Sequence, residues 1–230
     1  MNTITLAVAL EKKDFNNMIT RYHFQQQDKP MLLSLYQALS PLLDIHACYL
    51  SHAHLKDVDL EKYAAAFLTL GDGIDEMQSI YLQRNHVSEA YMLECIGMEL
   101  LTRTYEAFAG KLQSAMGVQA VRMHFIGDKY PYSVMDEMRE QMGETDISFN
   151  EQYCMTPQKS VAFLLELADT EEAAYGLTGE DELKHTHNAL CHVHLAHICA
   201  DCKNTDCEYR QKENYTYGYQ RIFGGQGRKG

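Results

Sequence analysis

The segment 88–108 constrains the fold more than any other part of the chain, because its apolar residues recur mostly at steps of three and four. This spacing predicts an amphipathic helix whose apolar face must be buried against another element. Gly110 follows as a natural end of the helix. Gly97 inside it costs up to about 1 kcal/mol relative to Ala, which suggests close packing at that point, and a glycine tolerated there by accident is the equally simple alternative. The apolar positions are Tyr91, Met92, Cys95, Ile96, Leu100, Tyr105 and Phe108.

Short apolar runs on both sides of this helix predict strands. Residues 45–50, 63–70 and 118–126 are short and apolar, as buried strands are. Residues 4–10 have no basic stretch before them, so they are read as a first strand and not as a signal peptide. A short extended piece is expected at 147–149.

Further helices are expected between these strands. Residues 31–43 show helical spacing, and Pro41 should bend or end that helix. A short amphipathic helix is expected at 74–81, and Pro131 is placed to open another over 132–142. Strands and helices intermix without a regular βαβ rhythm. The pattern therefore predicts a single α+β domain with a central, mainly antiparallel sheet and helices packed on it.

Composition limits the classes of function. The chain has 230 residues, enough for one sizeable core. Its formal net charge of −12 argues against nucleic-acid binding, which needs a basic surface. No apolar run approaches the roughly 18 residues of a membrane span. The odd count of seven cysteines, with Cys48 and Cys95 inside apolar segments, predicts reduced thiols and a cytoplasmic location.

A cluster of cysteines near the end of the chain is a candidate metal site. Cys199, Cys202 and Cys207 form the pattern C-x2-C-x4-C in a polar loop, and Cys191 is the favoured fourth ligand. Such a thiolate set can hold zinc or an iron–sulfur cluster, and spacing does not separate the two. His187 or His194 in place of Cys191 gives an alternative zinc site, and three unrelated free cysteines are the simplest alternative. We therefore divide the chain into an α+β domain at 1–180, a helix with this segment at 181–212, and a flexible tail at 213–230.

A motif with an uncommon combination of residues precedes the last predicted strand. Glu151, Met155, Pro157, Ser160 and Val161 form the pattern Glu-x-x-x-Met-x-Pro-x-x-Ser-Val. It resembles a signature of the activation domain of vitamin B12-dependent methionine synthase, which reads roughly Leu-Thr-Glu-Ser-x-x-Met-x-Pro-x-x-Ser-Val-Ser. An ordinary loop entering a core strand, with a solvated glutamate, is the alternative.

Two further blocks resemble the same family in the family's order. Residues 66–75 look like its apolar strand ending in Thr-Leu-Gly-x-x-Ile-Asp, and the helix 88–108 follows at the family's spacing. Arg122, with Pro131 nine residues later, matches the ends of a third family segment. The family's Pro-Gly-Tyr falls on residues 125–127, so its tyrosine is missing, and Tyr130 or Tyr132 is the available substitute.

The resemblance implies a function as well as a fold. Family members bind S-adenosylmethionine and dock on the cobalamin domain of methionine synthase. Together with an electron donor they restore methylcobalamin after cob(I)alamin has been oxidised. The cofactors carry that chemistry, so no catalytic residue is expected in the chain itself. By position, the resemblance implies that the S-adenosylmethionine site contains Arg122, Glu151, Tyr153, Met155, Pro157 and Ser160.

Two functions are therefore expected from the sequence. The first is a stand-alone reactivation protein for a cobalamin-dependent methyltransferase, with a cobalamin-binding methyltransferase and an electron-donor protein as partners. The alternative is a corrinoid-protein partner or metal-binding protein that keeps the fold without the methyl donor. Neither function involves nucleic acid or a membrane.

Overall fold

A five-stranded sheet forms the centre of the computed structural model, which describes residues 1–169 of the chain. The strand order is β1-β2-β3-β7-β4, and every neighbouring pair is antiparallel. The predicted α+β class with an antiparallel sheet is therefore confirmed. The strands are β1 (Asn2–Thr5), β2 (His46–Leu50), β3 (Tyr63–Thr69), β4 (Val118–Phe125) and β7 (Ser160–Asp169), and β5 (Ser148–Phe149) and β6 (Met155–Thr156) form a separate small hairpin.

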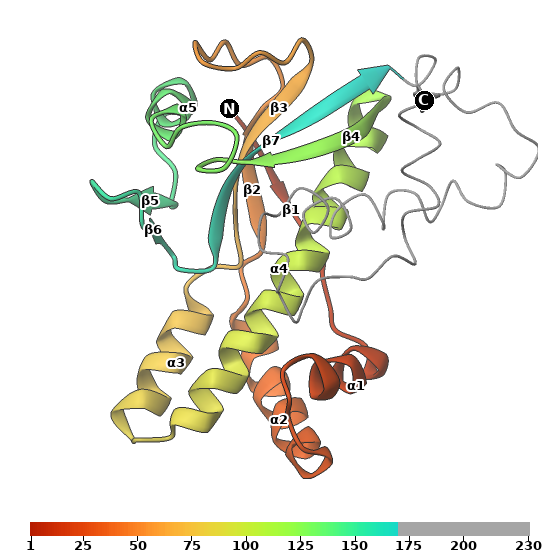
Figure 1. Cartoon of the computed structure of the whole chain (residues 1–230), viewed down its shortest axis with the longest axis vertical. Coiled ribbons are helices and arrows are strands. Elements are labelled where there is room, and N and C mark those ends of the chain that lie inside the picture. Colours follow the sequence, from red (N-terminus) through yellow and green to blue (C-terminus); the bar gives the residue numbers. More distant parts are fainter. Residues whose placement is uncertain (170–230) are drawn as a thin grey trace, which may run out of the picture.

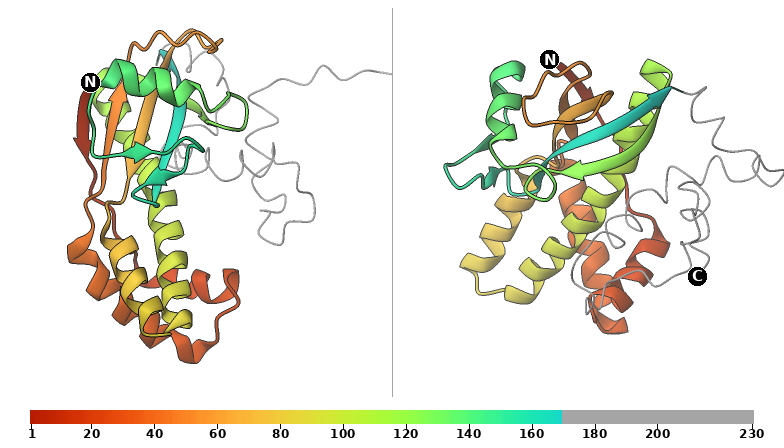
Figure 2. Two further views of the ribbon diagram at one scale, coloured as in Figure 1. Left: turned by 90° about the vertical axis from the view of Figure 1, so that its left-hand side faces the viewer. Right: turned by 45° about the horizontal axis from the view of Figure 1, so that its top comes forward.

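Helices cover the sheet from one end and from both faces. Three of them gather below the sheet, and a long helix runs from this group along one face (Figure 1). A short helix lies on the opposite face (Figure 2). Within residues 1–169 no helix is long and apolar enough to cross a membrane. The helices are α1 (Lys12–Arg21), α2 (Lys29–Leu39), α3 (Gly73–Gln83), the long α4 (Val87–Met116) and α5 (Val134–Met142), with 3₁₀ turns at Gln26–Asp28 and Ser40–Leu42.

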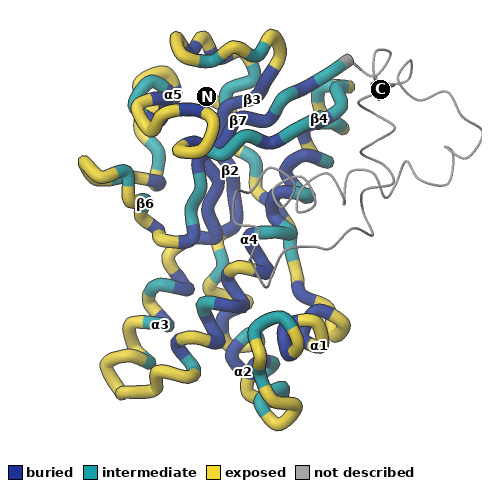
Figure 3. The backbone as a smooth tube through the Cα atoms, in the orientation of Figure 1, coloured by how far each residue is buried: buried dark blue, intermediate teal, exposed yellow. Residues whose placement is uncertain are grey.

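Both faces of the central strands are buried. Along β3, Leu68 packs into a core with α4, whereas its neighbour Phe67 packs into a second core with α5. Successive side chains of a strand point to opposite faces, so a strand covered on both sides must be apolar throughout. All seven residues of β3 are buried (Figure 3). We call the face that carries Phe67 the α5 face.

Ion pairs join α1, in the group of helices below the sheet, to the long helix α4. Asp14 pairs with Arg103, and Glu99 pairs with Arg21 and accepts a hydrogen bond from Tyr22 Oη at 3.1 Å. Burial, followed by the charge of Glu99, raises the pKa of Tyr22. Both carboxylates are buried and paired, so we assign them to the packing of α1 on α4.

The end of α4 differs from the prediction. The helix does not stop at Gly110 but continues to Met116, and Gly117 with φ +66° ends it. Leu112 lies beyond the predicted end and is fully buried. Packing of this extra length therefore outweighs the small helix-propensity cost of Gly110.

Other boundaries shift by a few residues. The first strand covers 2–5 where 4–10 was expected, although Leu6 and Leu10 are still buried. Helix α2 ends at Leu39, and Pro41 lies in the following 3₁₀ turn, as its fixed φ predicts. The predicted segments 181–212 and 213–230, with Cys191, Cys199, Cys202 and Cys207, lie outside the described residues.

Candidate ligand-binding site

The family-like motif begins in the hairpin β5–β6. The Asn150 side chain accepts hydrogen bonds from the backbone N–H of Gln152 at 3.0 Å and of Cys154 at 2.9 Å. The N–H of Tyr153 bonds to the backbone oxygen of Asn150 at 2.9 Å, and Tyr153 has a φ of +60°. An asparagine that bonds to the following backbone is a common way to close a tight turn. This turn points the Tyr153 ring back towards α5.

The second half of the motif is tied to the β3–α3 segment. Ser160 Oγ donates to Thr69 Oγ1 at 2.8 Å, and the backbone oxygen of Lys159 accepts from the N–H of Leu70 at 3.0 Å. The N–H of Gln158 donates to Asp75 Oδ2 at 2.8 Å. Two of the three family-like blocks, 66–75 and 148–161, thus meet in the structure.

One acceptor at this junction is unsatisfied. Asp75 Oδ1 is buried and has no hydrogen-bond partner among residues 1–169. Buried carboxylate oxygens are normally hydrogen-bonded, so an unpaired one needs an explanation such as an ion or a ligand.

Lys159 of the motif forms an ion pair in which the lysine side chain is buried. Its ammonium lies 2.7 Å from both carboxylate oxygens of Glu94 on α4. The lysine side chain is 8% exposed and that of Glu94 is 41% exposed. The stem of Lys159 crosses α4 at Gly97, where an added Cβ would lie 2.9 Å from Lys159 Cε. This contact confirms the close packing expected at Gly97.

A cavity of about 280 Å³ lies between the motif, β4 and α5. Its volume is just below the roughly 300–1,000 Å³ of ligand sites. None of its lining residues carries a charge, and Gln158 and Ser160 supply polar side chains. The lining consists of Phe125, Ile126, Tyr132, Met135, Tyr153, Met155, Gln158, Ser160, Val161 and Ala162.

Aromatic rings stack at one wall of the cavity. Tyr132 stacks on Tyr153 with centroids 5.4 Å apart and an interplanar angle of 15°, and Tyr153 stacks on Phe149 at 5.7 Å. The hydroxyl of Tyr153 donates to Asp136 Oδ2 at 2.6 Å, and this hydrogen bond raises the pKa of Tyr153. Gly127 allows the arrangement, because a Cβ there would lie 2.4 Å from Tyr132 Cζ. A flat wall of this kind suits a planar aromatic ligand group.

Three of the six expected binding residues line the cavity, namely Tyr153, Met155 and Ser160. Pro157 is buried next to the lining residue Gln158, and Glu151 is exposed in the turn between β5 and β6. Those two are therefore not brought into the cavity wall.

Arg122 lies on the α5 face, further along β4 from the cavity. It lies opposite Glu166 in the antiparallel register of β4 and β7, and its alternate neighbours His124 and Ile126 share its face of the strand. Four residues separate Arg122 from Ile126 of the cavity wall, a distance of about 13 Å along a strand. An extended ligand is therefore needed to reach from the cavity to Arg122.

Sequence reasoning missed some of the lining. Tyr132 was named as a substitute aromatic, and the structure places it in the wall. Met135 and Ala162 were not expected. The two-residue period of β7 is the signal that puts Ala162 on the same face as Ser160, whereas only the tertiary structure brings Met135 of α5 to that face.

A second hollow, of about 350 Å³, lies between residues 5–9 and 40–45. Its lining is mostly small and aliphatic residues, and Asp44 is its one ionisable residue. Neither the motif nor the aromatic stack contributes to it, so we place the candidate site at the smaller cavity.

The comparisons with known proteins add no relative: no protein-family model matches the chain, and no curated protein is significantly similar to it. The resemblance described above consequently depends on the motif residues themselves. The contacts of those residues in the structure decide what the resemblance supports.

Proposed function

We propose that the chain is a stand-alone reactivation protein for a cobalamin-dependent methyltransferase of the methionine synthase type, and that it binds S-adenosylmethionine. The observation that carries the proposal is the convergence of the family-like blocks. Phe125 and Ile126, inside the segment 122–131, line one cavity together with residues of the motif 148–161, and the block 66–75 holds the motif in place.

The residues present suit parts of this cofactor. Tyr132, which stacks on Tyr153 and is half exposed, offers aromatic surface for an adenine ring. Asp75, with its unpaired oxygen, holds the backbone of the lining residue Gln158 and supplies negative charge close to the cavity, as a cationic group requires. Arg122, on the same face, is suited to a carboxylate through its guanidinium fork.

The proposed role is positioning. When bound, S-adenosylmethionine would supply the methyl group, and an electron donor would supply the electron that returns cob(II)alamin on the partner to the reactive cob(I) state. The chain would hold the methyl donor in line with the cobalt of the docked partner, and positioning of this kind is how proteins accelerate transfer between two bound groups.

The uncharged lining favours a second candidate, a corrinoid-protein partner that keeps the fold without the methyl donor. A zwitterion with a sulfonium normally finds charged partners in its immediate contacts. A cavity without charge is better suited to an uncharged aromatic group from a docking partner.

Calorimetry with S-adenosylmethionine on the full chain tests the proposal. We expect binding that Arg122→Ala weakens by about 1.5–3 kcal/mol, the value of a hydrogen bond to a charged group. Arg84→Ala, at an exposed position after α3, is the control and should leave the affinity unchanged.

Absence of a heat of binding for the wild type would favour the second candidate. That candidate predicts a complex with an isolated cobalamin-domain protein, detectable by analytical ultracentrifugation. Failure of both binding measurements would refute both functions.

A further inference from the structure

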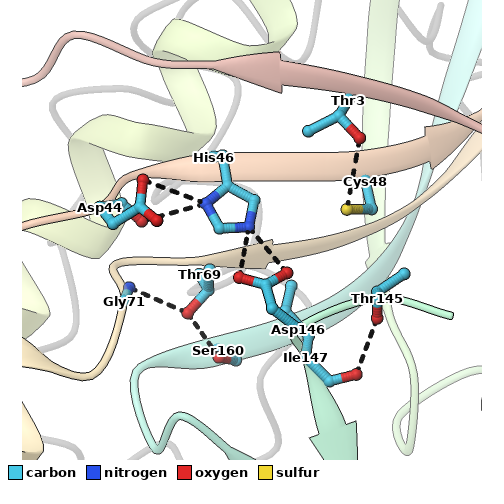
Figure 4. A network of polar contacts seen from close by, with 10 residues as sticks. All are labelled: Thr3, Asp44, His46, Cys48, Thr69, Gly71, Thr145, Asp146, Ile147 and Ser160. Atoms are coloured by element: carbon cyan, nitrogen blue, oxygen red, sulfur yellow. Dashed lines mark hydrogen bonds and ion pairs between the residues drawn. The ribbon is translucent and has the colours of Figure 1, made fainter.

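Three metal-ligating side chains meet on the α5 face, where Cys48 of β2 lies opposite Phe67 of β3. His46 and Cys48 are two residues apart on β2 and therefore share one face of that strand. Asp146 reaches them from the loop between α5 and β5 (Figure 4). Their ligand atoms all lie within 4.8 Å of one another. His46 and Cys48 are buried and Asp146 is exposed, so the group lies at the boundary between core and solvent.

The hydrogen bonds of His46 orient it as a metal ligand. Its Nδ1 lies 3.1 Å from the backbone oxygen of Asp44, which can only accept a hydrogen bond. Its Nε2 lies 3.0 Å from the carboxylate of Asp146, also an acceptor. A protonated imidazole would donate to both acceptors and form an ion pair with Asp146, whereas the neutral form that binds metals carries one N–H and leaves one of the two contacts without a proton. A cation between Nε2 and the carboxylate would satisfy the second contact, and an Nδ1–H bonded to a carbonyl is the usual support of a metal-bound histidine.

The other two ligands are also held in place. The loop that carries Asp146 is closed by a hydrogen bond from Thr145 Oγ1 to the backbone oxygen of Ile147 at 2.8 Å, and the Ile147 side chain is buried. Thr3, opposite Cys48 on β1, places its hydroxyl 3.8 Å from the sulfur.

We propose that His46 Nε2, Cys48 Sγ and an Asp146 carboxylate oxygen bind a divalent transition-metal ion of the zinc type. Nitrogen, sulfur and oxygen ligands together suit zinc or cobalt and not magnesium or calcium. Bonds of about 2.0–2.3 Å in tetrahedral geometry put ligand atoms about 3.3–3.8 Å apart, so only small shifts are needed. Three protein ligands leave a fourth position for water or a ligand, as in exchangeable zinc sites. The site uses none of the C-terminal cysteines as ligands and does not depend on the proposed function.

Cobalt titration of the full chain tests this site, because a thiolate bonded to Co²⁺ gives an intense near-ultraviolet band. The C-terminal cysteines are first removed as competitors by replacing Cys191, Cys199, Cys202 and Cys207 with serine. In that background we expect one bound Co²⁺ with the thiolate band. Adding Cys48→Ala should abolish the band, whereas Cys95→Ala, at a buried thiol in α4, should leave it unchanged.

Asp146→Asn keeps the test valid if Cys48→Ala does not fold, because its side chain is 58% exposed. We expect it to weaken Co²⁺ binding by roughly tenfold or more, since even outer-shell changes cost 10- to 100-fold. Asp57→Asn, in another exposed loop, is its matched control. No thiolate band in the cysteine-depleted background, or the same band and affinity in a folded Cys48→Ala or Asp146→Asn variant, would overturn the proposal.

Discussion

Replacing Glu94 by Gln removes the counter-charge of a buried ammonium group. Lys159 Nζ bonds to both oxygens of Glu94 at 2.7 Å, and the lysine side chain is 8% exposed. Breaking a fully buried pair by removing one partner costs about 3–5 kcal/mol. Because Glu94 is 41% exposed, water reaches this pair, and we expect a smaller loss of about 2 kcal/mol, or roughly 4–8 °C in Tm for a chain of this size.

Removing the other partner of the pair, Lys159, should cost less stability. Lys159→Met removes the buried charge and leaves the half-exposed carboxylate of Glu94 free to hydrate, so we expect a loss below about 1 kcal/mol. In the double variant no unpaired ammonium is left. Its stability should therefore be close to that of Lys159→Met and above that of Glu94→Gln alone.

The pH dependence gives an independent check. Burial acts to raise the pKa of Glu94, but hydrogen bonds from Lys159 and Gln78 outweigh it and hold the pKa below its ordinary value of 4.5. A carboxylate with a lowered folded-state pKa stabilises the fold above its unfolded pKa, and this contribution is lost as the pH falls through the folded value. The difference between wild type and Glu94→Gln should thus be complete at neutral pH and shrink below about pH 4.5.

Urea unfolding of the full chain, followed by far-ultraviolet circular dichroism, measures these differences. The three variants are compared with the wild type at pH 7 and pH 4. A Lys159→Met variant less stable than Glu94→Gln would refute the reasoning, as would a double variant in which the two losses add. The first result would mean that the lysine stem contributes more by packing than its charge costs, and the second that the two side chains do not interact.

Two glycine substitutions in α4 should have opposite effects on the free energy of unfolding. Gly97→Ala should destabilise the fold, because its Cβ would crowd Lys159. Gly110→Ala should stabilise it by up to about 1 kcal/mol, because no atom lies within 4 Å of the added Cβ. Urea unfolding gives both signs, and equal signs would contradict the packing described. Gly127→Ala should cost roughly 1–3 kcal/mol, because φ is +95° and its Cβ would overlap the Tyr132 ring. Near-ultraviolet circular dichroism should report a displaced Tyr132, and an unchanged tyrosine signal in a destabilised variant would show that the ring is not held there.

The local sequence pattern was enough to predict most helices and strands, but not which strands lie next to each other in the sheet. The apolar runs at 45–50 and 63–70 and the long helix could be predicted because burial imposes their composition. The insertion of β7 between β3 and β4 could not, since Thr69 and Ser160 are opposite each other although 91 residues separate them. Gly110 misled the prediction of the helix end because propensity is weaker than the burial of Leu112.

The candidate sites were harder to predict from the sequence, because their residues come from segments that are far apart in the chain. Tyr153 and Met155 follow from the motif, but the cavity exists only because α5 brings Met135 to it. His46 and Cys48 form a readable pattern, a histidine and a cysteine two residues apart in an apolar strand. Their third partner, Asp146, is 100 residues from His46 in the sequence, so only the fold identifies it.

The residues that carry the family resemblance divide into two groups in the structure. Thr69, Asp75, Lys159 and Ser160 contact one another's segments or α4, so they support the packing whatever the ligand is, and Ser160 also lines the cavity. The cavity wall, where Tyr132 stands outside the family's pattern, determines what can bind. Shared motif residues therefore argue more strongly for a shared junction than for a shared ligand. It follows that variants at the Lys159 pair should change stability without changing ligand affinity, and that only binding measurements can separate the two proposed functions.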